Sequence, residues 1–277
     1  MMYQLICDSC TDLPASMLQD SHVCKVPLTI QVGEDTFIDD ESFQQARLLE
    51  KMKAWPDAPK TACPSPHAFM EKFREDGDNY IVTLSARLSG SFNAAAQAVD
   101  LYREEGGKAN VHVFDSRSAT AGQAQTAMLI RDLAEKGAPF AEVVELVEER
   151  ISRMKTMFVL ENLDNLRKNG RLTRVQSLVT GALRVKLLMG ATREGEIEKL
   201  GQGLSIRQTL SRMVAHMGKN EGSMGRRLVI THCNCPDRAE YVRDLVRQKG
   251  LFDEIVIAPT GGIATVYAND GGVVVAF

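Results

Sequence analysis

The fold is best predicted from one stretch, Thr83-Leu84-Ser85-Ala86-Arg87-Leu88-Ser89-Gly90-Ser91-Phe92-Asn93-Ala94-Ala95-Ala96. Residues 80–84, which lead into it, are apolar and β-branched, which is typical of a buried strand. Residues 93–104, which follow the turn, are rich in alanine and predict a helix. Between them lies a turn of small hydroxyl residues around Gly90. The stretch therefore predicts a strand, a tight turn and a helix start.

Such a turn has two interpretations. A helix start directs free backbone N–H groups and the positive end of the helix dipole to one spot, which favours an anion. Ser85, Ser89 and Ser91 add hydroxyl donors there. The simpler interpretation is that one serine caps the helix. The turn is neither a P-loop, since no Gly-Lys-Ser/Thr ends it, nor the nucleophile turn of α/β-hydrolases, since Ser89 lacks the preceding Gly-x.

Composition limits the class of protein. A chain of 277 residues suits two domains, and its 33 basic residues nearly balance 36 acidic ones, so we expect no nucleic-acid partner. No apolar run is long enough to insert in a membrane, and the N-terminus does not resemble a signal peptide. Six cysteines in such a chain predict reduced thiols and a cytoplasmic location. We expect no metal or cofactor at the Cys7/Cys10 or Cys233/Cys235 pairs.

Residues 1–155 predict an N-terminal parallel α/β/α sheet, because strands and helices alternate along them. We expect strands at 3–7, 23–32, 36–38, 80–84 and 110–114, with helices between and after them. Asp12 is expected to cap the first helix. Three strands end in small polar residues, at Asp8-Ser9, Ser85 and Asp115-Ser116, and ligands of such sheets lie past these ends.

Thr61 lies, by this prediction, on a loop just before a second helix start, where Ser65 is the N-cap and Pro66 the first helical residue. Its hydroxyl either closes a local turn or faces the same place as Ser89.

Residues 156–277 predict a second α/β domain with a mixed sheet. A hairpin is expected around Thr192-Arg193-Glu194-Gly195, followed by two strand–helix units and a last strand at 273–276. Short helices are expected at 162–168 and 174–178, and longer ones at 205–217 and 237–249.

Six landmarks in order along nearly the whole chain resemble the DegV family of bacterial fatty-acid-binding proteins. They are residues 6–14, 26–30, Thr61 to Pro66, Leu88 to Phe92, 114–116, and 163–172 with Asn169-Gly170-Arg171.

The resemblance implies a two-domain fold that buries a long-chain fatty acid as its ligand and has no cofactor. It implies that Thr61 and Ser89 bind the carboxylate, with backbone N–H groups near Gly90 and Ser91. It also implies that the protein binds the acid without any turnover of its own. In some members of the family, the binding protein presents the acid to an ATP-dependent kinase that makes an acyl phosphate. Burial of a chain of palmitate size contributes roughly 11 kcal/mol, so the tail would dominate affinity and the hydroxyls would orient the head.

The sequence departs from the family pattern in four places. Ala62 and Cys63 stand where Ser and Gln are usual, Asn169 replaces a Gly, and Leu187 replaces a Pro. Tyr267 stands where the family usually has a His, and its hydroxyl either donates one hydrogen bond to the ligand or belongs to a half-buried core tyrosine.

Arg171 is expected either to guide a partner or to cap a helix C-terminus. Two other functions remain open at this stage. One is a hydrolase or transferase that uses a serine of the Ser89-Gly90-Ser91 turn, although no Ser-His-acid set is visible. The other is a binder of a different carboxylate or phosphate ligand.

Overall fold

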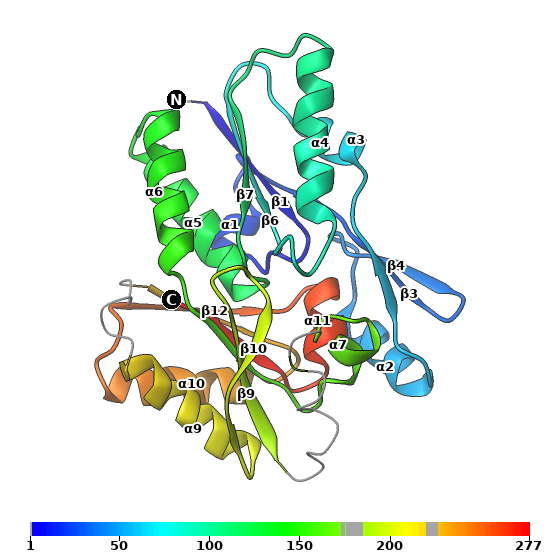
Figure 1. Cartoon of the computed structure of the whole chain (residues 1–277), viewed down its shortest axis with the longest axis vertical. Helices are drawn as coiled ribbons and strands as arrows, with labels where there is room; N and C mark the ends of the chain where they lie inside the picture. The colour runs from blue at the N-terminus through cyan, green and yellow to red at the C-terminus, as the bar shows by residue number, and fades with distance from the viewer. Residues whose placement is uncertain (1, 173–174, 176–184, 220–226) are drawn as a thin grey trace.

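Four parallel strands form the first sheet, in the order β2–β1–β6–β7 (Figure 1). The structure, a computed structural model, describes all residues except 1, 173–174, 176–184 and 220–226. The strands are β1 (Tyr3–Asp8), β2 (Val23–Val26), β6 (Asp78–Thr83) and β7 (Val111–Asp115). The parallel sheet predicted for the N-terminal part is confirmed.

Helices cover both faces of this sheet because its strands are apolar on both sides. Leu5 and Val82 pack toward α5 (Ala121–Glu135) and α6 (Phe140–Arg153). Ile6 and Ile81 pack toward the opposite face, against α3 (Pro66–Met70) and α4 (Ser91–Glu104). Pro66 and Ser65 start α3 as predicted, with Ser65 Oγ accepting from Ala68 N.

The second sheet has six strands in the order β10–β9–β8–β13–β11–β12 and is mixed, since β11 and β12 are parallel and the other pairs antiparallel. This confirms the predicted mixed sheet. Its strands are β8 (Thr156–Val159), β9 (Lys186–Ala191), β10 (Ile197–Gly203), β11 (Arg227–His232), β12 (Glu254–Pro259) and β13 (Val273–Ala276). Helices α9 (Ile206–Met217) and α10 (Pro236–Gln248) pack on one face.

Helix α5 packs between the two sheets (Figure 1). Its sequence is rich in alanine, and small residues such as Ala124 and Ala127 are fully buried, so both sheets approach it closely. Val229 and Ala276 of the second sheet share one core with Leu5 of the first. The division into domains at residues 155 and 156 therefore stays a prediction, because the two sheets share this core.

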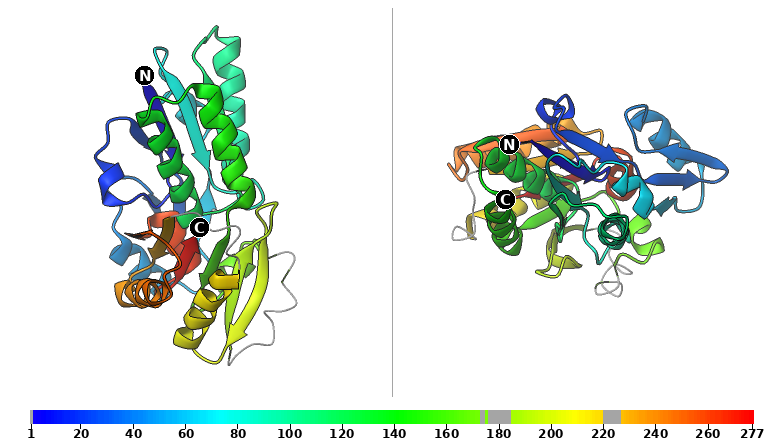
Figure 2. Two further views of the ribbon diagram at one scale, coloured as in Figure 1. Left: turned by 90° about the vertical axis from the view of Figure 1, so that its left-hand side faces the viewer. Right: turned by 90° about the horizontal axis from the view of Figure 1, so that it is seen from above.

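A third, small sheet was missed in part. We expected one strand over 23–32, but the chain forms β2 and then β3 (Thr29–Val32) in a different sheet, because Pro27 interrupts the ladder. β3 pairs with β4 (Asp35–Ile38) and with β5 (Lys60–Ala62). Thr61 therefore lies on a strand and not on the predicted loop. The β3–β4 hairpin projects from the body of the molecule in Figures 1 and 2, and α2 (Gln45–Ala54) follows it.

Three further short helices lie in the described part of the chain: α1 (Ala15–Leu18), α7 (Asp164–Lys168) and α11 (Gly262–Ala268). Pro14, not Asp12, precedes α1 as its cap residue, so the predicted role of Asp12 is wrong. Helix α11 was not predicted at all. The helix predicted at 174–178 falls almost wholly outside the described residues.

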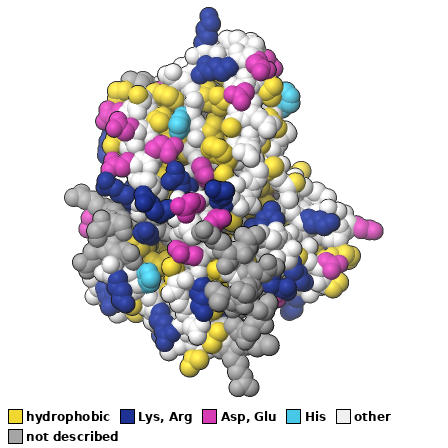
Figure 3. Space-filling model, in the orientation of Figure 1, with side chains coloured by type: hydrophobic (Ala, Val, Ile, Leu, Met, Phe, Trp, Pro, Cys, Tyr) yellow, Lys and Arg dark blue, Asp and Glu magenta, His cyan; other side chains and the backbone are white. Residues whose placement is uncertain are grey.

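The surface in Figure 3 carries interspersed basic and acidic side chains, in keeping with the formal net charge of −3. None of the helices in the described part of the chain combines the length and apolar character needed to cross a bilayer.

Candidate functional site

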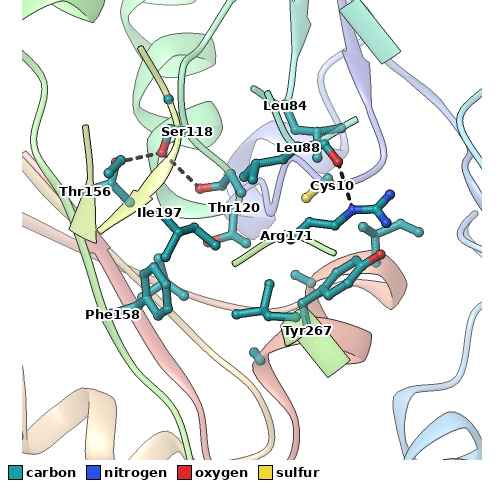
Figure 4. A pocket seen from close by; sticks show the side chains of 18 of the residues that line it. Cys10, Leu84, Leu88, Ser118, Thr120, Thr156, Phe158, Arg171, Ile197 and Tyr267 are labelled. Carbon is teal, nitrogen blue, oxygen red and sulfur yellow. Dashed lines mark hydrogen bonds between the residues drawn. The ribbon is translucent and has the colours of Figure 1, made fainter. Parts of the chain in front are cut away.

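A cavity of about 100 Å³ lies where the two sheets and α11 meet (Figure 4). Its wall is almost entirely apolar, and both halves of the chain contribute to it. Among its described lining residues are Cys10, Leu84, Leu88, Ala119, Phe158, Leu160, Leu166, Ile197, Ile263, Ala264, Tyr267 and Val274. The loops that follow β1, β6 and β7 all reach it, as expected of the carboxyl ends of parallel strands.

The turn between β6 and α4 reaches this cavity through Leu84 and Leu88. The carboxylate of Asp8 holds its start, because Asp8 Oδ2 accepts from Leu84 N at 2.8 Å. Burial raises the pKa of Asp8 to about 6, although Leu84 N and Gln123 donate to it. Ser85 Oγ donates to Gly195 O at 2.8 Å, so this predicted donor belongs to the contact with the β9–β10 hairpin.

The sequence left two roles open for the other residues of the turn, capping of the helix and donation of hydrogen bonds to an anion. Gly90 is the N-cap residue of α4. Ser89 Oγ accepts from Ser91 N at 3.2 Å, which leaves the hydroxyl hydrogen of Ser89 free to donate to another group. The side chain of Ser91 is fully buried beside Asp8 and is not among the described residues that line the cavity.

Thr61 and Tyr267 meet, although 206 positions separate them in sequence. Thr61 lies on β5 opposite Ile30, and its Oγ1 is 2.8 Å from Tyr267 Oη. Both side chains are half-buried, and Tyr267 lines the cavity. One of the two hydroxyl hydrogens forms this bond, so the other is free to donate.

The Thr61 segment also approaches the Ser89 turn. A β-carbon built on Gly90 would lie 3.2 Å from Cys63 Sγ, two residues beyond Thr61. The structure therefore brings Thr61 into contact with Tyr267, and brings Cys63 of the same segment close to the Gly90 turn. No hydrogen bond joins Thr61 directly to Ser89 in the described structure.

Arg171 enters the same region and is the one basic residue among the described residues that line the cavity. Its Nε donates to Leu88 O at 3.1 Å, and Nη1 donates to the carbonyl of Asn169, the C-cap residue of α7. In Figure 4 Arg171 and the Tyr267 hydroxyl lie on one side of the cavity. The sequence predicts that Arg171 either guides a partner or caps a helix C-terminus, and it does not place Arg171 at the cavity.

A hydroxyl pair lies on the other side of the cavity in Figure 4. Ser118 Oγ and Thr156 Oγ1 are 2.6 Å apart and buried. Because they bond to each other, they add little polarity to the wall. Neither residue was singled out from the sequence, since nothing local marks a hydroxyl in the loop after β7 and a hydroxyl on β8 as partners.

The serine-enzyme alternative finds no support in these contacts. The hydroxyl of Ser89 bonds to Ser91 N, and none of the described histidines hydrogen-bonds to it. His22 and His112 bond to Asp20 and Glu148 elsewhere. A serine nucleophile needs a base within hydrogen-bond reach.

The cysteine pairs do not form a metal centre in the described residues, where no three His, Cys, Asp or Glu side chains cluster suitably. Cys7 is buried in the core of the first sheet. Cys10 lines the cavity, and burial raises the pKa of its thiol well above the ordinary value.

Comparison with known proteins identifies relatives along the whole chain. A family model described as "Uncharacterised protein, DegV family" matches residues 2–277. A DegV domain-containing protein of Streptococcus gordonii is 33% identical over 279 residues, which cover 100% of this chain and 99% of that protein.

Solved structures of similar proteins also match the whole chain. A DegV family protein from Ruminococcus gnavus, described with vaccenic acid, is 40% identical with a TM-score of 0.94, covering 100% of this chain and 99% of that chain. The Streptococcus pneumoniae Fatty Acid Kinase (Fak) B3 protein, loaded with linoleic acid, is 31% identical with a TM-score of 0.91 and the same coverage. Because the family model spans all but the first residue, and these relatives match over their whole length, the chain belongs to the DegV family.

Proposed function

We propose that this protein binds one long-chain fatty acid, with the acyl chain in the apolar cavity and the carboxylate at its polar side. The observation that carries the proposal is the contact of Thr61 with Tyr267, which lines a cavity whose wall is almost entirely apolar. The relatives from Ruminococcus gnavus and Streptococcus pneumoniae are described with vaccenic and linoleic acid, respectively, which supports the same ligand class here.

Three hydroxyls and one guanidinium are available for the head group. The Thr61–Tyr267 pair has one free hydrogen, and Ser89 has another. Arg171 contributes a positive charge that favours the ionised acid. The N-cap Gly90 brings the start of α4 to the same neighbourhood. Ser91 contributes through its backbone N–H, which fixes the Ser89 hydroxyl, rather than through its own side chain.

The acyl chain supplies most of the affinity, at about 0.8 kcal/mol for each buried methylene. A cavity of about 100 Å³ is smaller than the usual range for ligand pockets. Uptake of a long chain therefore requires lining side chains such as Leu88, Phe158 and Ile197 to move aside.

The test is to measure binding of vaccenic acid to the purified, delipidated protein by titration calorimetry and native mass spectrometry. Thr61→Val, Ser89→Ala and Tyr267→Phe each remove a proposed donor, and each is expected to weaken binding about tenfold without unfolding the protein. Thr36→Val is the matched control, because Thr36 is exposed on β4 of the same small sheet as Thr61. A wild-type protein that takes up no fatty acid, or three variants with unchanged affinity, would contradict the proposal.

The finer proposal is that the protein acts in the cytoplasm as a carrier and presents the acid to an ATP-dependent fatty acid kinase. The name of the Streptococcus pneumoniae relative supports such a partner. The carboxylate oxygen would attack the terminal phosphorus of ATP on the kinase, giving an acyl phosphate and ADP, while this protein only holds the acid. Acyl phosphate is expected to form when the kinase, ATP and the loaded protein are mixed, and not when the loaded protein is omitted. Formation of acyl phosphate in the absence of this protein would refute the carrier role.

A further inference from the structure

Helix α11 forms one wall of the cavity. Ile263, Ala264, Tyr267 and Ala268, four of its seven residues, line it. A small displacement of this helix would move both the apolar wall and the phenol that meets Thr61. What fixes α11 therefore bears directly on the site.

The start of α11 is held by a carboxylate from far along the chain. Asp39, just after β4, accepts from Gly262 N at 2.6 Å through Oδ1 and from Ile263 N at 2.9 Å through Oδ2. Its side chain is only 3% exposed. A β-carbon on Gly262 would lie 2.8 Å from Asp39 Oδ1, so glycine is needed for this close approach. Asp12 adds a third bond by accepting from Gly261 N at 2.7 Å.

Gln45, the first residue of α2, holds the same turn from a second direction. Its Nε2 lies 2.9 Å from both the carbonyl oxygen and Oγ1 of Thr260, and 3.0 Å from Thr265 Oγ1. Unlike Asp39, Gln45 is only half-buried. Two neighbouring segments thus converge on the first turn of α11.

The small sheet β4–β3–β5 and the residue that follows β4 contact α11 at two places, its first turn and Tyr267. Asp39 follows β4 and binds the first turn, while Thr61 on β5 binds Tyr267 one turn further on. The backbone of Asp39 is itself tied to Leu28 O beside β3, at 3.0 Å. The position of Tyr267 relative to Thr61 thus depends on the same sheet that carries Asp39.

We propose that Asp39 and Gln45 are positioning residues of the acyl-chain site, which hold the first turn of α11 so that Tyr267 and Ile263 stand correctly in the cavity. This inference rests on the proposed function. Neither Asp39 nor Gln45 lines the cavity, so the effect of each on ligand affinity is exerted through the position of Tyr267.

The experiment is a double-mutant cycle on vaccenic acid affinity. Asp39→Asn keeps the shape of the side chain but turns one acceptor into an amide donor facing a backbone N–H, so binding is expected to weaken about tenfold. In a Tyr267→Phe background the same substitution is expected to weaken binding about threefold or less, because the group that it positions is already gone. A purely structural role would give the same loss in both backgrounds.

Gln45→Met repeats the cycle at a half-buried position and provides the test if Asp39→Asn does not fold. Asp40→Asn is the matched control, since Asp40 is the exposed neighbour whose side chain accepts hydrogen bonds from Ser42. The inference alone would be overturned if Asp39→Asn and Gln45→Met fold and bind vaccenic acid with wild-type affinity. It would also be overturned if their losses of binding free energy add fully to the loss caused by Tyr267→Phe. Wild-type protein that takes up no vaccenic acid would overturn the proposed function and this inference together.

Discussion

The buried carboxyl of Asp12 makes a strong prediction about stability and pH. Its Oδ1 accepts from Gly261 N, but Oδ2 is buried without a hydrogen-bond partner. Burial therefore raises the pKa of Asp12 to about 8, with Asp39 and Asp8 nearby adding to the rise. The folded protein holds this carboxyl in its neutral form at neutral pH, whereas the unfolded chain releases the proton near pH 4.

The magnitude follows from this difference in proton binding. Between pH 5 and 7 the folded state binds about one more proton at Asp12 than the unfolded state, so stability falls as pH rises, by about 1.4 kcal/mol per pH unit. Asp12→Asn keeps an oxygen for Gly261 N and carries no charge at any pH, so it removes this dependence. The variant should gain about 3 kcal/mol relative to wild type between pH 5 and pH 7.

Urea unfolding of both proteins at pH 5, 6 and 7 measures this difference. The pH dependence of every other group is present in both proteins and largely cancels. Asp40→Asn is the control, because Asp40 is exposed and is ionised in both states over this range. If wild type and Asp12→Asn keep a constant difference in the free energy of unfolding across these pH values, the reasoning about the buried neutral carboxyl is refuted.

Three further predictions concern packing. Gly195→Ala should destabilise the protein by about 2 kcal/mol in urea unfolding, since Gly195 has φ +84° and a β-carbon there would lie 2.3 Å from Ser85 Oγ; an unchanged midpoint would count against this contact. Ala264→Leu should fill part of the cavity and lower vaccenic acid affinity while the fold is kept, as calorimetry and circular dichroism would show, and undiminished affinity would place the acyl chain elsewhere. Ser118→Ala should cost about 1–3 kcal/mol by leaving the Thr156 hydroxyl unpaired, and the further change Thr156→Val should restore most of it; a double variant as unstable as the sum of the singles would disprove the pairing.

Much of the fold was predictable because it depends on local patterns. The apolar run before Ser85 and the alanine-rich run after Gly90 form β6 and α4, and alternation of strands and helices implies the parallel sheet. The hairpin around Gly195 was also predictable from its turn residues, and it forms β9 and β10. In each case the residues that decide the structure are neighbours in sequence.

The missed elements have partners that are distant in sequence. Residues 261–268 have a weak helical pattern, with Gly261 and Gly262 at their start, and α11 forms because carboxylates more than 220 positions away accept its first N–H groups. Thr61 lies in a strand only because β3 pairs with β5 and supplies its backbone hydrogen-bond partners.

The sequence by itself determined the fold class, the two kinds of sheet and the family resemblance, because apolar periodicity and short motifs are written along the chain. It also pointed to Thr61, Ser89 and Tyr267 as separate candidates. Only the tertiary structure decided that Thr61 and Tyr267 touch, that Arg171 lines the cavity and that Asp12 holds α11 rather than α1. The physical reason is that each of these contacts joins side chains from different elements, and their distances follow from how α5 and the three sheets pack together.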